Sequence, residues 1–386
     1  MAMDGFSESE KENYKNLIKA VSSISNLFSD SDKPYIDYRL AENMFCRCFN
    51  AENLSRSDCS IDARIDRTGI GIKTFLDNTE TQKIAEFNKD STKYRDLENE
   101  AIIRAVSKLR NQRLEFTKSA YGVDETLYHC MIRGSGIVRI IENPMELVSL
   151  DDISDISVKK NVIVFTDGLC EYRFNKSKST LYKKFDCDES LLDVEVEIIE
   201  DPFEILLGLQ KEIRVSSPAV PPREYVVLPL YSDGKSGRYV PRKSGLNQWN
   251  ASGRTRSYDE VYIPIPIRIH RMHPTFFPDR FVDFDLRLPD GKTILSAKVC
   301  QDSGKALMTN PNAALGEWIL RKVLKVPKGE LVTYELLDDL GINSVIIYKN
   351  SESDYSIDFT NCDFCDETME LNPELLSGGF CSKRDY

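Results

Sequence analysis

The N-terminal part of the chain alternates between helical and strand-like hydrophobic patterns. Five apolar residues recur every three or four positions and predict an amphipathic helix that ends before the Ser/Asp-rich stretch 29–33: Tyr14, Leu17, Ile18, Val21 and Ile24. A second amphipathic helix is expected over 38–49. Period-two alternation then predicts strands over 60–65 and 69–75, and a long polar stretch over 80–110 favours helix.

The pattern becomes strand-rich from residue 128 onward. Strands are expected over 130–141, 161–166 and 169–174, and helical periodicity returns over 201–215. The proline-rich run 216–222 is typical of a linker. Beyond it lie short strands separated by Gly, Pro and Asp, with brief helices over 312–324 and 333–340; the expected strands are 225–231, 260–266, 281–288, 293–298 and 344–348.

These elements predict an α+β protein of five segments. A helical N-terminal segment (1–33) precedes an α/β domain (34–215), and the linker (216–222) leads to a closed or partly closed antiparallel barrel (223–350). Residues 351–386 hold 2 basic and 9 acidic side chains and are expected to form a peripheral acidic tail.

Composition sets limits on where the protein works. The chain has 386 residues, of which 41% are hydrophobic, and it shows neither a signal-peptide pattern nor an apolar run long enough to span a bilayer. A cytoplasmic protein without membrane contact is therefore expected, and its ten cysteines are expected to remain thiols. Cys362 and Cys365 have zinc-ligand spacing, but with Cys381 they still lack a convincing fourth ligand.

The net charge of -11 conceals an uneven distribution. Residues 221–350 carry 19 basic and 14 acidic side chains, whereas residues 1–220 carry 30 basic and 39 acidic ones. Within the basic region, residues 235–256 contain six Lys or Arg side chains and no acid. Such a stretch attracts phosphate.

This basic stretch lies in a long loop, 231–265, rich in Gly, Ser, Arg and Asn between two apolar strands. Its side chains are those that read DNA, because arginine can pair with guanine, asparagine and glutamine can pair with adenine, and lysine can anchor phosphate. Loops of this length are usually functional or disordered, so a solvated basic loop without a ligand remains the alternative.

Three runs in this region carry a family resemblance: VPRKSGLN from Val240, YIPIP from Tyr262 and QDSGK from Gln301. In this order they resemble the C-terminal domain of restriction endonucleases of the NgoFVII kind, which is similar to the DNA-binding pseudobarrels of BfiI, EcoRII and plant transcription factors. The resemblance covers about 125 residues and implies two arms that grip the major groove, over 238–256 and 301–312. The candidate contacts are Arg238, Arg242, Lys243, Asn247, Trp249, Arg254 and Arg256 in the first arm, and Gln301, Lys305 and Asn310 in the second. Trp249 is equally compatible with packing the loop.

A second resemblance concerns cleavage. The phospholipase-D-like mechanism found in some NgoFVII-type enzymes needs an H-x-K pattern, which none of the three histidines provides. Residues 38–90 instead resemble a divergent PD-(D/E)xK nuclease, which implies catalytic roles for Glu42, Asp62 and Lys73, with Mg²⁺ held by Glu42 and Asp62.

This pattern departs from the family at Gly71, where an acid usually stands two residues before the lysine. Glu86 is the second choice for the acid supplied by a helix, and Asp66 can replace Asp62 if the strand register differs. Lys73 on a solvated sheet face is the alternative reading. A further basic run supplies three candidate phosphate contacts, unless it is only an exposed strand edge: Asn175, Lys176 and Lys178.

Together the two resemblances imply a type II restriction endonuclease that hydrolyses double-stranded DNA with Mg²⁺. Cleavage of both strands implies a homodimer on DNA, and a cognate DNA methyltransferase is the expected genetic partner. The rival hypothesis is a non-catalytic, sequence-specific DNA-binding regulator, which would bind DNA without metal-dependent cleavage.

Overall fold

The computed structural model describes residues 2–55, 59–210, 223–235, 237–280 and 282–362. Its contacts divide the chain into two compact units. Of the described residues, those within 2–55, 59–114 and 123–210 form the first unit, and those within 115–122 and 223–362 form the second. The expected linker 216–222 lies outside the described residues.

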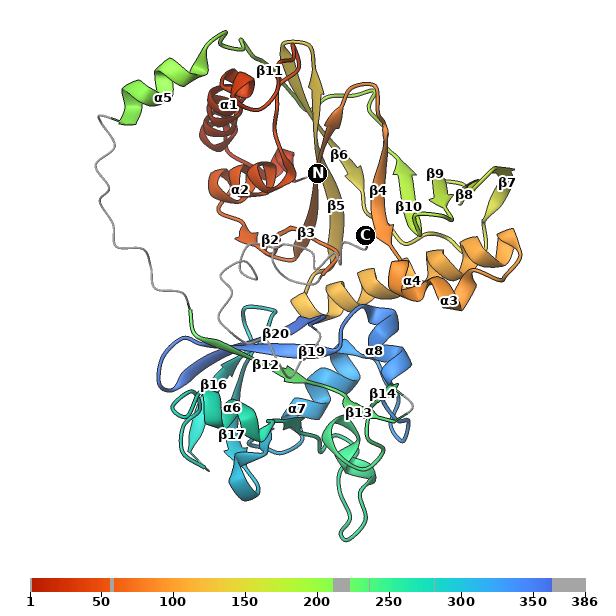
Figure 1. Cartoon of the computed structure of the whole chain (residues 1–386), viewed down its shortest axis with the longest axis vertical. Coiled ribbons are helices and arrows are strands. Elements are labelled where there is room, and N and C mark those ends of the chain that lie inside the picture. The colour runs from red at the N-terminus through yellow and green to blue at the C-terminus, as the bar shows by residue number, and fades with distance from the viewer. Residues whose placement is uncertain (1, 56–58, 211–222, 236, 281, 363–386) are drawn as a thin grey trace. The chain divides into compact units, whose positions relative to one another are not determined.

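The described residues of the first unit form two sheets. One is a mixed six-stranded sheet with order β1-β2-β3-β5-β6-β11, in which the β3–β5 pair is parallel and the other pairs are antiparallel. Figure 1 shows the helices α1 and α2 on one side of these strands. The bounds are η1 (Met3–Gly5), α1 (Glu8–Ser23), η2 (Ser25–Leu27), α2 (Tyr38–Cys48), β1 (Glu52–Asn53), β2 (Ala63–Ile65), β3 (Thr68–Leu76), β5 (Glu125–Gly134), β6 (Ile137–Pro144) and β11 (Leu192–Glu195).

The helical N-terminal segment is part of this unit, because α1 buries Tyr14 and Ile18 in the same core as α2 and the sheet. Ser7 and Glu10 form a capping box that begins α1. On β3, Ile70 and Ile72 point into this core, as the alternating pattern predicts. The expected boundary at residue 33 therefore separates no independent segment.

A second, antiparallel sheet of the first unit has the order β4-β10-β9-β8-β7. The bounds are β4 (Thr81–Glu86), η3 (Asn88–Asp90), α3 (Ser91–Tyr94), α4 (Asn99–Tyr121), β7 (Ser154–Lys159), β8 (Val162–Thr166), β9 (Glu171–Asn175), β10 (Thr180–Lys184) and α5 (Pro202–Gln210). Apolar residues of α4 pack on this sheet in one core, and the last residues of α4, 115–121, belong to the second unit.

Two expectations for this region are wrong. The polar stretch 80–110 begins with the strand β4, and its long helix starts only at Asn99. The expected strand 130–141 is instead the hairpin of β5 and β6, which turns at Gly136 with φ of +64°. Glycine adopts this left-handed conformation without strain.

The second unit is a seven-stranded sheet with order β12-β19-β20-β16-β17-β18-β15, in which β16 and β20 are parallel. Its end strands β12 and β15 contact each other, so the sheet curls into a half-barrel, which agrees with the expected partly closed barrel. The expectation of a purely antiparallel barrel is wrong, because β16 and β20 are parallel. The bounds are β12 (Tyr225–Pro229), β13 (Ser232–Gly234), β14 (Gly237–Tyr239), η4 (Gly245–Asn250), β15 (Ile263–Pro264), α6 (Ile267–Met272), β16 (Asp283–Arg287), β17 (Ile294–Cys300), η5 (Asp302–Gly304), β18 (Ala306–Thr309), α7 (Ala314–Gly316), η6 (Glu317–Val323), α8 (Tyr334–Leu340), β19 (Ser344–Lys349) and β20 (Asp354–Thr360).

The acidic tail expected from residue 351 is wrong in its first part. Residues 354–360 form β20, which lies between β19 and β16 inside the sheet. Its Tyr355, Ile357 and Phe359 are buried, whereas the polar residues between them are partly exposed. The barrel therefore extends to residue 360.

Candidate functional sites

The first candidate site lies where α2 meets the β2–β3 hairpin of the first unit. Glu42 is on the buried face of α2, with only 5% of its side chain exposed. Asp62 directly precedes β2, and its Oδ2 accepts a hydrogen bond from the Ile72 backbone N–H at 2.7 Å. Lys73 is the next residue on β3 and is partly exposed.

The charge of Asp62 acts on Glu42, and the charge of Lys73 acts on Asp62. Burial raises the pKa of Glu42, and the negative charge of Asp62 raises it further. Burial also raises the pKa of Asp62, and the ammonium of Lys73 is the largest influence that lowers it. The structure thus brings Glu42, Asp62 and Lys73 into one neighbourhood.

Arg39, which sequence reasoning missed, is the cation beside these carboxylates. Its Nη1 donates to Glu42 Oε2 at 3.0 Å and also to the Ser55 carbonyl. Arg39 stands one helical turn before Glu42 on α2, and this i,i+3 spacing of arginine and glutamate is the sequence signal that could have identified it. Its charge lowers the pKa of both Glu42 and Asp62.

The alternative acids lie elsewhere. Asp66 is exposed in the β2–β3 turn with φ of +51°. Glu86 ends β4 in the five-stranded sheet, where its carboxylate is bonded to Lys83 Nζ at 2.7 Å and to Asn88. Across the described ranges, no group of three or more His, Cys, Asp or Glu side chains could hold a metal ion.

Gly71 explains the missing acid of the PD-(D/E)xK pattern. A Cβ at this position would overlap Met145 Cε and lie 3.1 Å from Tyr128 Cδ1. The Lys73 Nζ lies 6.0 Å from the centroid of the Tyr128 ring, and the buried Lys183 Nζ lies 5.7 Å from it. An aromatic and a thioether side chain therefore occupy the space that an acid would need.

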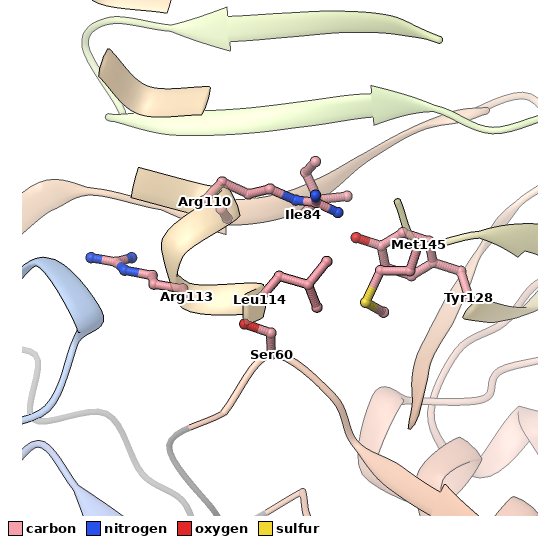
Figure 2. Close-up of a pocket in the computed structure, with 8 residues that line it drawn as sticks. Ser60, Ile84, Arg110, Arg113, Leu114, Tyr128 and Met145 are labelled. Carbon is pink, nitrogen blue, oxygen red and sulfur yellow. The ribbon is translucent and has the colours of Figure 1, made fainter. Parts of the chain in front are cut away.

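Tyr128 and Met145 also line a small pocket of the first unit (Figure 2); the other lining residues are Ser60, Ile84, Ala85, Arg110, Arg113 and Leu114. Arg113 points away from Tyr128 and Met145 in this view, and it donates to Asp90 Oδ2 at 2.7 Å. Arg110 donates to the Glu146 carbonyl. Because both guanidinium groups are bonded within the protein, the pocket offers little for a phosphate.

The first arm of the second unit presents some predicted contacts and buries others. Arg242 and Lys243 are exposed, which suits phosphate contacts. Asn247 is fully buried: its Nδ2 donates to the carbonyls of Pro241 at 3.1 Å and Val332 at 2.9 Å, and its Oδ1 accepts from the Val332 N–H at 2.9 Å. In this arrangement Asn247 holds the loop and has no free amide for a base.

Three other predicted side chains of this arm are engaged with the protein. Arg254 donates to Glu260 Oε2 at 3.1 Å with an exposed side chain, so its guanidinium is oriented at the surface. Arg256 Nη1 donates to the Ala251 carbonyl at 3.0 Å. The Trp249 ring lies 5.2 Å from the Tyr258 ring with a buried Nε1, which favours the packing interpretation.

Arg238, at the base of the same arm, lies on β14. Its guanidinium is 4.7 Å from the centroid of the Tyr231 ring, and its Nε is 3.5 Å from Asp233 Oδ1. Its side chain is 31% exposed. Arg238 therefore packs at the base of the arm, and its side chain is only partly accessible to a DNA ligand.

The predicted second arm is split by β18. Gln301 and Lys305 are exposed in the turn between β17 and β18, whereas Asn310 follows the other end of β18. Asn310 Nδ2 donates to Asp283 Oδ2 at 3.3 Å. The compact arm is thus the turn 301–305, and Asn310 is not part of it.

The remaining basic candidates occupy the β9–β10 hairpin of the first unit. Asn175 Oδ1 accepts from the Lys178 N–H at 3.1 Å and from Ser177 Oγ at 2.8 Å, so Asn175 stabilises the turn. Lys176 Nζ donates to Asn99 Oδ1 at 3.1 Å, and Lys178 is exposed. Of the three, Lys178 is the best presented for phosphate.

The cysteines and the helices can be compared with the compositional expectations within the described residues. Cys362 and the other described cysteines form no disulfide with one another, whereas Cys365 and Cys381 lie outside the described residues. Of the helices in the described ranges, none combines the length and apolar character that crossing a bilayer requires.

Residues 226–351 match the family model of the NgoFVII C-terminal B3-like DNA-binding domain. The match covers β12 to β19 and includes both candidate arms. No curated protein matches the chain. The resemblance of this region to the reading domain of a restriction enzyme family is therefore confirmed, and the nuclease resemblance of the first unit stays a prediction.

Proposed function

Because residues 226–351 form a B3-like DNA-binding domain of a restriction enzyme family, we propose that this protein is a sequence-specific endonuclease of double-stranded DNA. The family match is the observation that carries the proposal. Restriction enzymes combine such a reading domain with a cleaving one, and the first unit holds the buried carboxylate of Glu42, the half-buried carboxylate of Asp62 and, near Asp62, the ammonium of Lys73. The proposed reaction is Mg²⁺-dependent hydrolysis of a phosphodiester bond.

Recognition is assigned to the second unit. Exposed Arg242 and Lys243 are placed to contact phosphates, which positions the protein without reading sequence. Arg254, held by Glu260 at the surface, and Gln301, on the second arm, are the base-reading candidates. Basic residues on both arms fit a polyanionic duplex despite the net charge of -11 of the whole chain.

Cleavage is assigned to Glu42, Asp62 and Lys73. The donor chemistry fits Mg²⁺, because the negative charge of Asp62 raises the pKa of Glu42 and a divalent cation would offset this repulsion. Mg²⁺ commonly takes one or two carboxylates and keeps several waters. When bound, the ion would supply Lewis-acid activation of the phosphate. Arg39 would hold Glu42 in place, and Lys73 would orient the attacking water.

Cutting both strands would require two such centres, so we propose a homodimer on the cleaved DNA. A cognate DNA methyltransferase would protect the host genome at the same sequence. Both proposals depend on cleavage, and both can be tested once a recognition sequence is known.

The first experiment is incubation of the full chain with unmethylated phage and plasmid DNA, with Mg²⁺ or with EDTA. Wild-type protein is expected to give discrete Mg²⁺-dependent fragments. Lys73→Ala is expected to lower the cleavage rate at least about 100-fold, the scale expected when a reactant is no longer held in position. Lys83→Ala is the matched control, because Lys83 lies on β4, where it pairs with Glu86.

The alternative function is a sequence-specific DNA-binding regulator without catalysis. One observation favours it: the family match covers the DNA-reading region, residues 226–351, and not the first unit. It predicts that wild-type protein and the Lys73→Ala variant bind the same sequence equally and that neither cuts DNA. Intact DNA across varied substrates, with selective binding retained, would establish this function in place of the nuclease.

A further inference from the structure

We propose that His270 is a positioning residue that sets the conformation of the second DNA-reading arm. The inference rests on the proposed DNA recognition by residues 226–351 and deepens it. His270 belongs to the short helix α6, and the arm is the turn 301–305 between β17 and β18. No base or phosphate contact is assigned to His270 itself.

The turn has an unusual backbone. Gln301, Ser303 and Gly304 have φ of +66°, +61° and +67°. Residues other than glycine rarely adopt this left-handed region, and a strained backbone persists only where its surroundings fix it. Within the turn, the Gly304 N–H donates to the Gln301 carbonyl at 3.2 Å. A contact from outside the turn is therefore needed to hold it.

His270 makes this contact. Its Nε2 lies 2.8 Å from the Gly304 carbonyl oxygen. A carbonyl can only accept, so the imidazole carries its proton on Nε2 and donates it. A Cβ on Gly304 would lie 3.0 Å from His270 Nε2 and 3.1 Å from Val299 Cγ1, so glycine permits the close approach of the ring.

A second bond holds the neighbouring carbonyl. The Ile265 N–H, just after β15, donates to the Lys305 carbonyl at 2.8 Å. The carbonyls of Gly304 and Lys305 are thus held by His270 and by the Ile265 backbone. This anchorage fixes the turn whose two ends are the exposed Gln301 and Lys305.

The consequence concerns specificity more than overall affinity. Bidentate reading of a base requires a side chain to start from a fixed backbone position, whereas a lysine can reach a phosphate from several positions. Without the hydrogen bond from His270 the backbone of the turn can relax, and the Gln301 side chain no longer extends from a fixed backbone position. Specific binding should weaken, and non-specific binding should change little.

The experiment first selects the preferred sequence from random duplexes with the wild-type full chain. Fluorescence anisotropy then compares this duplex with a scrambled one for His270→Ala, His270→Gln and His273→Ala, in Ca²⁺ to prevent cleavage. His273 is the matched control, because it is the other histidine at the end of α6 and its ring faces Glu224 at 3.8 Å. Salt titrations and thermal denaturation are recorded for every variant.

His270→Ala is expected to lower specific affinity about 10-fold, the scale of losing one hydrogen bond to an ordered group, with less than a twofold change on scrambled DNA and an unchanged salt slope. His270→Gln, which keeps a side-chain N–H donor, should recover part of the loss. His273→Ala should match wild type. Gly304→Ala should reproduce the His270→Ala phenotype and add little to it in the double variant.

Two results would overturn the inference while leaving DNA recognition intact. One is selective wild-type binding that His270→Ala does not alter. The other is an equal loss on specific and scrambled DNA together with a lowered melting temperature, which would show a purely structural role. If wild-type protein selects no sequence at all, the proposed function fails and the inference fails with it.

Discussion

The Asp62 carboxylate accepts a hydrogen bond from the Ile72 backbone N–H at 2.7 Å. In the β2–β3 ladder Ala63 is opposite Ile70, so Asp62 stands one position beyond the end of β2. Its side chain supplies the acceptor for the N–H of Ile72. This bond fixes the carboxylate beside the strand residue that precedes Lys73.

Replacement of Asp62 separates its charge from its hydrogen bond. Asp62→Asn keeps an oxygen that can accept from Ile72 but removes the charge, so we expect near-normal folding with loss of Mg²⁺-dependent cleavage. Asp62→Ala leaves the Ile72 N–H without this acceptor and should lower stability further, by about 1–3 kcal/mol. Urea denaturation and plasmid cleavage measure the two effects. Full cleavage by Asp62→Asn would remove Asp62 from the catalytic site.

Glu42→Gln tests whether the buried carboxylates are kept at a cost in stability. Burial and the charge of Asp62 raise the pKa of Glu42 above its ordinary 4.5, so the folded protein binds an extra proton between the two values. Ionised Glu42 therefore destabilises the fold above the raised pKa, and the penalty fades as the pH falls through it. We expect Glu42→Gln to be more stable than wild type at pH 7 and equal to wild type near pH 4.

Melting temperatures across this pH range measure the effect, with Glu52→Gln as control, because Glu52 is 46% exposed and pairs with Arg64. Mg²⁺ should raise the melting temperature of wild type and not that of Glu42→Gln, since binding to the folded state stabilises it. A less stable Glu42→Gln at pH 7 would show that the bond to Arg39 outweighs the burial penalty.

Gly71 marks the limit of the nuclease resemblance. Gly71→Asp would restore the usual acid of the family pattern, but its side chain would enter the space of Met145 and Tyr128. We expect a loss of roughly 1–3 kcal/mol from overpacking and no gain in cleavage. Gly208→Ala in α5, where no heavy atom lies within 4 Å, should be neutral or stabilising.

A double variant with Met145→Ala tests the cause. If the overlap with Met145 is responsible, Gly71→Ala should cost less in the Met145→Ala background than in wild type, a non-additivity that thermal denaturation can measure. An equal loss of stability in both backgrounds would show that Tyr128, and not Met145, limits the space at position 71.

The fold could be predicted from the sequence where the spacing of hydrophobic residues had a clear period. The helices α1 and α2, the β2–β3 hairpin and the paired strands β8 and β9 follow directly from hydrophobic spacing. The strand β4 was missed because four of its six side chains are polar and its two apolar residues, Ile84 and Ala85, are adjacent, which gives no alternation. The strand β20 was missed for another reason: its period of two is present, but the net charge of the surrounding tail suggested an appendage.

The candidate sites could be predicted in residue type but not in exposure. Glu42, Asp62 and Lys73 were chosen by their order along the chain, and the structure brings them together. Asn247 was chosen because asparagine can read adenine, yet it is the most buried candidate of its arm. A loop without periodicity gives no sign of which side chains turn inward, so this distinction needed the fold.

Asn247 therefore supports a last prediction that separates structural from base-reading roles. Asn247→Ala removes both hydrogen bonds donated by Nδ2 and the acceptor for the Val332 N–H, and it leaves buried partners unsatisfied. We expect a loss of roughly 2–4 kcal/mol in stability.

Asn250→Ala is the control, because Asn250 is exposed and donates to the Arg242 carbonyl at 3.0 Å. Loss of this hydrogen bond should cost about 1 kcal/mol at most. Urea denaturation measures the stability of each variant, and selection from random duplexes measures its base preference. A stable Asn247→Ala protein that tolerates a substitution at one adenine of its site would instead assign Asn247 to base reading and would require the arm to open on DNA.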